Sequence, residues 1–231
     1  MKKLGVALMW ILWGIALGVM MLVLMLLFER PLYGDARDVY EKHKRSVVLV
    51  VSFKPASEEF TAGGGVVVTP NSVITMNHIV PEGWTVKTIF FGEQHAQEVY
   101  VGQRDQENDL ARLSLNGNIP TGLMHPMELD ISSPDVGQTL YVIGHPAAAL
   151  WSLSIGYAMF PHERELHLNN AKPRKILQVS ATASEGSSGG AVIDEHGKLR
   201  GLASMLQTDR SVMFVTPARF ACKLIKCKEK K

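Results

Sequence analysis

A succession of short runs that are rich in β-branched residues or alternate between apolar and polar residues constrains the fold of this chain more than any other feature. Ten such runs lie between residues 46 and 216, without long helical patterns between them, and clusters of Pro, Asn, Asp and Gly separate several of them. The runs are residues 46–53, 65–69, 85–91, 97–101, 110–115, 139–143, 176–180, 189–193, 199–204 and 212–216. Many short strands at this spacing predict an all-β sandwich or barrels.

Composition excludes several classes of protein. The chain has 231 residues and a formal net charge of +2, so its length allows one or two small domains and its charge gives no reason to expect a nucleic-acid partner. Cys222 and Cys227 are its only cysteines, which excludes a disulfide framework and a Cys-rich metal site in the main body. The histidines show no metal-ligand spacing, and we expect neither a metal nor a cofactor.

An uncharged apolar stretch precedes the strands. Residues 4–28 follow Lys2 and Lys3 and would form a helix of roughly 37 Å, longer than a hydrocarbon layer of about 30 Å. We expect residues 1–28 to be an uncleaved transmembrane signal anchor that makes the chain a single-pass membrane protein. A cleaved signal peptide is the alternative, but its apolar region would be shorter and would end in a small-residue cleavage site, which residues 24–34 lack.

The charges on the two sides of this stretch compete. Lys2 and Lys3 favour a cytoplasmic N-terminus, whereas the basic residues between positions 42 and 45 lie near the other end. Because a large folded domain can be exported despite such charges, we expect the domain to be extracytoplasmic, on the periplasmic side of the inner membrane. Residues 29–36 would form a tether. Residues 217–231 would form a short basic helix that closes the chain, with residues 221–231 as a basic C-terminal tail.

The stretch ASEGSSGGAV, residues 183–192, raises the question of whether one of its serines is catalytic. A Gly/Ser cluster by itself is usually a loop. Ser188 also completes a G-x-S-x-G pattern, which would suggest the nucleophile elbow of an α/β-hydrolase. Against that interpretation, the flanking segments both resemble strands, and little chain remains downstream for both an acid and a histidine.

Two upstream residues combine with Ser188. His78 directly follows an apolar strand in VITMNHIV, and Asp109 directly precedes the strand LARLSL. Each alone is more typical of a structural or turn residue, but together they give the order His, Asp, Ser of the chymotrypsin arrangement. The chemistry is consistent, because a serine hydroxyl needs a base to take its proton, and an aspartate can hold a histidine in position for that task.

Four segments resemble the HtrA (Deg) family of serine proteases. They are GGGVVVTPNSVITMNHIV (63–80), ENDLARLSL (107–115), VGQTLYVIGHPAAA (136–149) and ILQVSATASEGSSGGAVIDEHGKLRGLAS (176–204). The match runs in register from about residue 38 to residue 219. The resemblance implies a chymotrypsin-like double β-barrel over residues 37–220, with barrels at about 46–125 and 126–220 and the active site between them.

The resemblance also implies roles for individual residues. Ser188 falls on the nucleophile, His78 on the general base and Asp109 on the residue that orients the base, while the N–H groups of Gly186 and Ser188 form the oxyanion hole. It implies a protein or peptide substrate. HtrA-type protease domains commonly form trimers, so a homotrimer is one assembly open to this chain.

Some positions depart from the family pattern. Ser187 stands where trypsin-type enzymes have Asp and HtrA-type enzymes usually have Asn, and no IVGG-like start is present, so we expect no zymogen cleavage. His145 replaces the usual Asn of its segment, and we expect it to be structural. Residues 157–175 match a loop that takes part in activation in HtrA-like enzymes, although here they could be a plain exposed loop. Too few residues follow Pro217 for a PDZ domain, and we expect none.

The resemblance places five residues around the S1 pocket, which are Thr182, Ser204, Met205, Leu206 and Met213. Leu206 and Met213 would narrow this pocket and make it apolar, which predicts small or medium aliphatic P1 residues. The alternative is that they are ordinary core residues.

We therefore expect a membrane-anchored serine endopeptidase that acts on unfolded or membrane-proximal proteins. The alternative is a catalytically silent or regulatory binding protein on a protease scaffold, since a fold does not imply a function. The presence of His78, Asp109 and Ser188 favours the enzyme, because a silent relative would be free to lose any of them.

Overall fold

The computed structural model describes residues 13–23, 35–115, 121–123, 125–160, 163–166, 174–182, 184–206 and 212–227. The chain divides into two units, Met1–Asp35 and Ala36–Lys231. In the first unit, residues 13–23 are helical. Within the described parts of the chain, no helix combines the length and apolar character needed to cross a membrane. The remainder of the predicted anchor at residues 1–28, and most of the predicted tether, lie outside the described residues.

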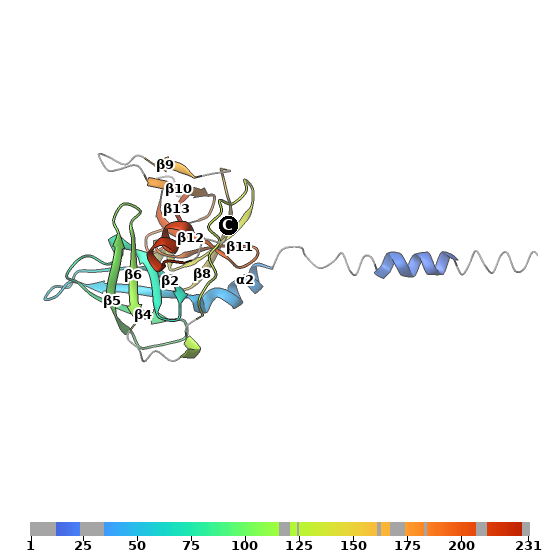
Figure 1. The fold of residues 1–231 in the computed structure, drawn as a ribbon. Coiled ribbons are helices and arrows are strands. Elements are labelled where there is room, and N and C mark those ends of the chain that lie inside the picture. Colours follow the sequence, from blue (N-terminus) through green and yellow to red (C-terminus); the bar gives the residue numbers. More distant parts are fainter. Residues whose placement is uncertain are drawn as a thin grey trace, which may run out of the picture. The chain divides into compact units, whose positions relative to one another are not determined.

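Six antiparallel strands of the second unit close into a barrel (Figure 1). They are β1 (Val47–Phe53), β2 (Phe60–Thr69), β3 (Ser72–Met76), β4 (Thr85–Phe90), β5 (Gln97–Asp105) and β6 (Leu110–Leu115). Their order around the barrel is β1-β2-β3-β6-β5-β4, with β4 paired back to β1. β1, β3 and β4 are rich in β-branched residues, which pack well on a pleated surface, whereas β6 (LARLSL) is held by the burial of its leucines.

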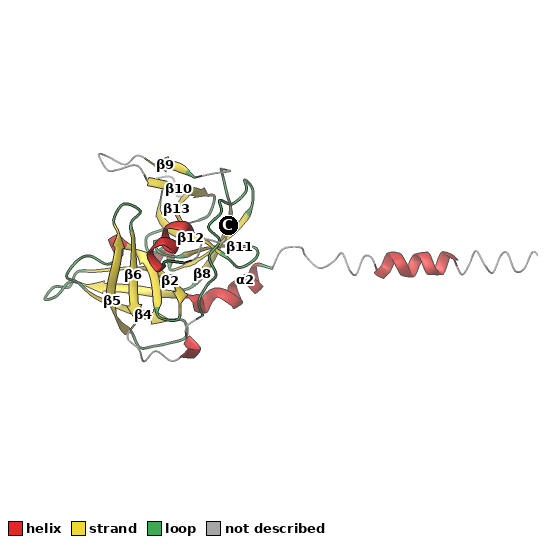
Figure 2. Ribbon diagram, viewed as in Figure 1, coloured by secondary structure: helices red, strands yellow, loops and turns green. Residues whose placement is uncertain are grey.

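A second sheet has seven strands in the order β8-β7-β11-β12-β13-β10-β9. Its strands are β7 (Thr139–Gly144), β8 (Ser152–Tyr157), β9 (Arg164–Leu166), β10 (Arg174–Val179), β11 (Ala191–Asp194), β12 (Leu199–Leu206) and β13 (Met213–Pro217). The sheet curls, because a bridge between Ala158 and Val179 joins the end of β8 to β10. The predicted all-β class is confirmed by these two sheets, which account for most of the regular structure in Figure 2.

Short helices lie at the ends of the strands. They are α2 (Ala36–His43), η1 (Lys44–Ser46), η2 (Asn77–Ile79), η3 (Thr121–Leu123), η4 (Pro146–Ala148) and α3 (Ala218–Ile225). α3 ends at Lys226, whose backbone is left-handed, and a disulfide joins Cys222 to Cys227 across that end. The short helix predicted near the C-terminus is present as α3, whose apolar face is buried, and the predicted tail at 221–231 begins within it.

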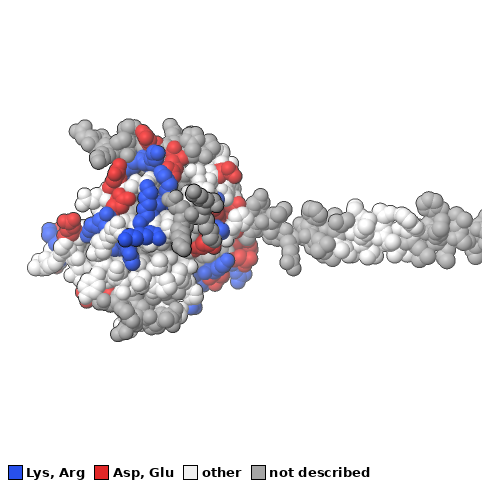
Figure 3. Space-filling model, viewed as in Figure 1, with Lys and Arg blue, Asp and Glu red and all other residues white. Residues whose placement is uncertain are grey.

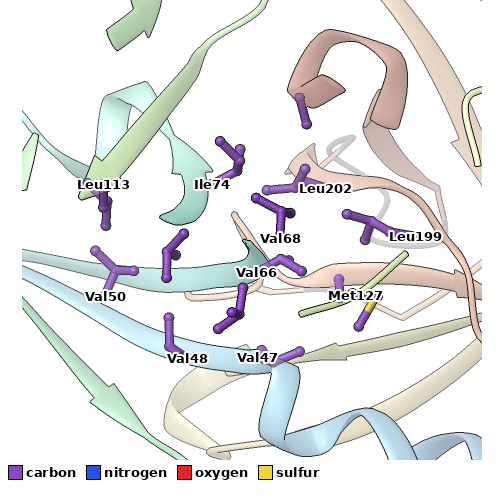
Figure 4. Close-up of a cluster of buried hydrophobic side chains, with 14 of the residues drawn as sticks. Val47, Val48, Val50, Val66, Val68, Ile74, Leu113, Met127, Leu199 and Leu202 are labelled. Carbon is purple, nitrogen blue, oxygen red and sulfur yellow. The ribbon is translucent and has the colours of Figure 1, made fainter. Parts of the chain in front are cut away.

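One apolar core joins the two sheets. It includes residues of β1, β2, β3 and β6 from the barrel together with residues of β11, β12 and α3. Figure 4 shows part of it, with Val66 and Val68 of β2 facing Leu199 and Leu202 of β12. A smaller cluster fills the second sheet alone. Since interiors pack as densely as organic crystals, this shared core fixes the edges of the two sheets relative to each other.

Candidate active site

His78 and Asp109 come together because their strands are neighbours. His78 lies in η2 directly after β3, and Asp109 directly precedes β6. β3 and β6 pair with Met76 opposite Leu110, so the two residues emerge at the same edge of the barrel. Nδ1 of His78 lies 2.7 Å from Oδ2 of Asp109, and the backbone N–H of His78 donates to Oδ1 of Asp109 at 3.0 Å.

The surroundings of the two side chains differ. Asp109 is buried, whereas 49% of the His78 side chain is exposed. Burial by itself would raise the pKa of Asp109, but the hydrogen bonds and charge of His78, together with the charge of Arg174, hold that pKa below its ordinary value. Asp109 is therefore a carboxylate at neutral pH. A carboxylate only accepts hydrogen bonds, so Nδ1 of His78 carries the proton and Nε2 is left as the basic nitrogen.

A tight loop, residues 184–190, presents Ser188. The N–H of Ser187 donates to the Ser184 carbonyl at 3.0 Å, and the N–H of Gly190 donates to the Ser187 carbonyl at 3.0 Å. Ser187 is buried, and its hydroxyl accepts the N–H of Ser184 at 3.0 Å. Ser187, which departs from the HtrA pattern, therefore stabilises the loop by an internal hydrogen bond.

Two N–H groups of this loop are available to a ligand. The Glu185 carbonyl accepts the N–H of Ala147 at 2.8 Å. Because a trans peptide points its C=O and N–H in opposite directions, the Gly186 N–H is directed away from Ala147. Gly186 has φ +88°, and a Cβ there would collide with the His145 carbonyl oxygen. Among the described residues, the N–H groups of Gly186 and Ser188 donate no hydrogen bond.

The glycine run in β2 explains how the barrel supports this loop. The N–H of Gly64 donates to the Ser188 carbonyl at 2.7 Å. A Cβ on Gly64 would lie 2.6 Å from the Gly190 nitrogen, closer than real Cβ contacts come. Glycine at this position therefore lets the backbone of the first barrel touch the backbone of the Ser188 loop, which belongs to the second sheet.

Ser188 does not bond His78 in this structure. Its hydroxyl donates to the Ser204 carbonyl of β12 at 2.9 Å. Both Ser188 and His78 nevertheless line one cleft of about 440 Å³. The Ser188 hydroxyl must therefore leave the Ser204 carbonyl before it can donate to Nε2 of His78.

The cleft includes some of the predicted pocket residues. Ser204 and Met213 line it, and Met213 is also part of the core of the second sheet. Thr182 is exposed and is not in the lining. Met205 and Leu206 belong to β12, but their side chains lie outside what the structure describes.

Sequence reasoning missed Arg174. This residue begins β10 and lines the same cleft. Its Nη1 atom donates to Oδ2 of Asp109 at 3.2 Å. The two residues are 65 positions apart, and no motif connects them, so only the packing of β10 near the barrel edge could reveal the contact.

His145 lies behind the cleft and joins the two sheets. Its Nε2 donates to the Val48 carbonyl at 3.1 Å, and its Nδ1 accepts the N–H of Trp151 at 3.1 Å. Burial lowers the pKa of His145 to about 4, so the ring is neutral at neutral pH. Across the described residues, no three His, Cys, Asp or Glu side chains gather in a way that could hold a metal ion.

Residues 63–202 match the family model of the trypsin-like peptidase domain. The chain belongs to this family. Trypsin-like peptidases share the arrangement described above, with a His–Asp pair and a Ser-bearing loop facing one cleft. The matched range contains His78, Asp109 and Ser188.

Several relatives within the family are HtrA-type proteins, which confirms the predicted resemblance. The chain is 24% identical over 153 residues to the serine protease Do-like HtrA of Lactobacillus helveticus, covering 64% of this chain and 36% of that protein. It is 24% identical over 175 residues to the serine endoprotease DegS of Escherichia coli, covering 71% and 47%. The chain thus spans less than half the length of these relatives. The Rv3671c protease of M. tuberculosis in its active form shares the fold, with a TM-score of 0.71, 22% identity and coverage of 84% and 85%.

Proposed function

We propose that this chain is a serine endopeptidase in which Ser188 is the nucleophile, His78 the general base and Asp109 the residue that orients the base. The observation that carries the proposal is the 2.7 Å contact between His78 and a buried carboxylate, at the wall of the cleft that Ser188 also lines. The similarity to HtrA-type serine proteases supports the same chemistry.

The reaction would begin with a rotation of the Ser188 side chain. The hydroxyl leaves the Ser204 carbonyl and donates to Nε2 of His78, which takes the proton as Oγ attacks the carbonyl carbon of the substrate. Asp109 stabilises the imidazolium that forms. The oxyanion would accept the N–H groups of Gly186 and Ser188, which have no other partner among the described residues.

The second half of the reaction reverses these roles. His78 gives its proton to the leaving amine, and the C–N bond breaks to leave an acyl group on Ser188. A water molecule then attacks this ester while His78 accepts its proton, and Ser188 is regenerated. No step requires a metal or an organic cofactor.

The proposed substrate preference comes from the HtrA resemblance. The HtrA resemblance puts Thr182, Ser204, Met205, Leu206 and Met213 around the S1 pocket, and Ser204 and Met213 do line the cleft. Leu206 and Met213 would narrow the pocket and make it apolar. Small or medium aliphatic P1 residues fit such a pocket. Anchoring by residues 4–28, an extracytoplasmic protease domain, a homotrimer and unfolded or membrane-proximal protein substrates complete the proposal on the sequence and the resemblance alone.

The test is labelling by a fluorophosphonate probe. The wild-type chain is expected to be labelled. The Ser188→Ala variant is expected not to be labelled and to have a kcat about 10⁶-fold lower. A Ser184→Ala variant is the matched control, since Ser184 also lines the cleft and its bond to the Ser187 hydroxyl is made by its backbone N–H, which alanine keeps. A wild-type chain that no phosphonate labels under any condition would favour a binding protein in which the Ser188–Ser204 hydrogen bond is permanent.

A further inference from the structure

Arg174 adds a third contact to the carboxylate that holds His78. Oδ1 of Asp109 accepts the backbone N–H of His78, and Oδ2 accepts both Nδ1–H of His78 and Nη1–H of Arg174. The Arg174 side chain is 22% exposed and the Asp109 side chain 9%. The ion pair is therefore largely withdrawn from solvent, where charged hydrogen bonds are stronger than at the surface.

The position of Arg174 in β10 decides which way its charge faces. Neighbouring residues of a strand point to opposite faces of the sheet. Lys175 is exposed and lines a separate hollow with Arg219 and Glu163, on a side of the molecule where Lys and Arg side chains gather over β10 and α3 (Figure 3). Arg174 instead lines the catalytic cleft.

The contact joins parts of the site that come from different sheets. Asp109 and His78 stand at the edge of the first barrel, whereas β10 belongs to the second sheet and leads directly toward the loop that carries Ser188. Without Arg174, the Asp109 carboxylate would lose one of its hydrogen bonds. The site would also lose a contact between the barrel that carries His78 and the sheet that carries Ser188.

Two other charged side chains must be considered near His78. Arg104 of β5 donates from Nη1 to Oδ1 of Asn77 at 2.5 Å, and Glu185 lines the cleft from the Ser188 loop. Of the described cations, Arg174 is the one that bonds the carboxylate itself. Its charge opposes the protonation of His78, since a second positive charge near an imidazolium is unfavourable.

We infer that Arg174 is a positioning residue for the Asp109–His78 pair: it fixes the carboxylate from the second sheet and extends the activity of the site to lower pH. This inference rests on the proposed triad. It predicts that Arg174 acts on the rate of the chemical step and on its pH dependence, and has little effect on substrate affinity.

The experiment compares the full chain with Arg174→Gln and Arg174→Lys, with Lys175→Gln as the matched control that removes a neighbouring charge. The rate of fluorophosphonate labelling is measured between about pH 5 and pH 9, around the ordinary pKa of histidine. Arg174→Gln is expected to slow labelling about 10- to 100-fold and to move the midpoint of the acid limb upward by about 0.5–1 unit. Arg174→Lys keeps the positive charge but lacks the planar guanidinium group. Its pH midpoint should therefore equal that of the wild type, while its labelling rate should lie between those of the wild type and Arg174→Gln. Lys175→Gln should match the wild type in both.

Several results would overturn the inference. One is an unchanged rate and midpoint in Arg174→Gln. Another is a rise in KM for peptides with unchanged labelling, which would make Arg174 a substrate contact. A third is a slower rate with an unshifted midpoint that Arg174→Lys does not improve, which would make the residue merely structural.

A readout that needs no turnover separates this inference from the proposed function. The ring protons of His78 are titrated by NMR in Ser188→Ala and in Ser188→Ala/Arg174→Gln. A higher midpoint in the double variant supports the role of Arg174 even if the wild-type chain labels with no probe. Equal midpoints would refute the role even if the wild-type chain is an active peptidase.

Discussion

His145 is a single side chain whose protonation state is tied to folding. Both of its ring nitrogens bond the backbone, Nε2 as a donor to Val48 and Nδ1 as an acceptor from Trp151. The Trp151 indole adds a hydrogen bond to the Val47 carbonyl at 2.8 Å. A proton on Nδ1 would abolish its capacity to accept, so the bonded arrangement requires the neutral ring.

The stability of the fold should therefore fall in mild acid. The pKa of His145 in the folded chain is about 4, below the ordinary value of about 6.5, so the unfolded chain binds more protons between these two values. The contribution of His145 to the free energy of unfolding is fully present above about pH 6.5 and is lost as the pH falls toward 4. Between pH 7 and pH 5 the free energy of unfolding should fall by about 2 kcal/mol because of this group. Urea unfolding at the two pH values measures the loss.

His145→Asn is the control, because Asn is the residue that the HtrA motif has there and it does not titrate. The pKa of His43 is also lowered, chiefly by burial, but its contribution is the same in both proteins and cancels. A decline between pH 7 and pH 5 that is as large in His145→Asn as in the wild type would contradict the assignment.

At the scale of elements, the agreement between sequence and structure depended on how apolar each strand is. The runs that became β1, β4 and β6 were predicted with bounds within one or two residues, since β1 and β4 are rich in β-branched residues and β6 has leucines that alternate with other residues. β8 and β9 were missed because their sequences, SLSIGY and REL, carry polar and charged residues. These strands form through pairing with β7 and β10, which a local pattern does not contain.

The Ser188 loop offers a prediction at this scale. Gly186→Ala places a Cβ at a positive φ and against the His145 carbonyl, so the peptide that carries the Gly186 N–H must shift. We expect kcat to fall about 10²- to 10³-fold, which is the usual effect of losing one oxyanion donor. Kinetics on a peptide substrate and circular dichroism of the same sample provide the measurement. Activity near that of the wild type in a folded Gly186→Ala protein would exclude this N–H from the oxyanion hole.

At the scale of the whole molecule, the unit Ala36–Lys231 has a core that joins both sheets. The Ser188 loop is held by Ser187, Gly64 and Ala147 through hydrogen bonds within this unit. No described contact of the loop calls for a newly freed N-terminus, and Ser187 has no charge with which to bind one.

Residues 36–231 preceded by a tag should therefore be active without cleavage. The measurement is fluorophosphonate labelling of the tagged protein, with mass spectrometry to show that the tag remains attached. Ser188→Ala in the same tagged chain is the control. Labelling that begins only after a protease exposes an internal N-terminus would show that the chain is a zymogen.

The sequence by itself predicted the all-β class, because local propensity and alternation depend on the segment alone. It also proposed His78, Asp109 and Ser188 as a triad, on their residue types, their order and the resemblance to HtrA proteases. Only the tertiary structure decided the contacts of Arg174 with Asp109 and of His145 with Val48, whose partners are 65 and 97 residues apart. It also decided that the Ser188 hydroxyl bonds Ser204. Such contacts arise when two sheets pack around a shared core, and their geometry is a property of the packing rather than of any segment of the chain.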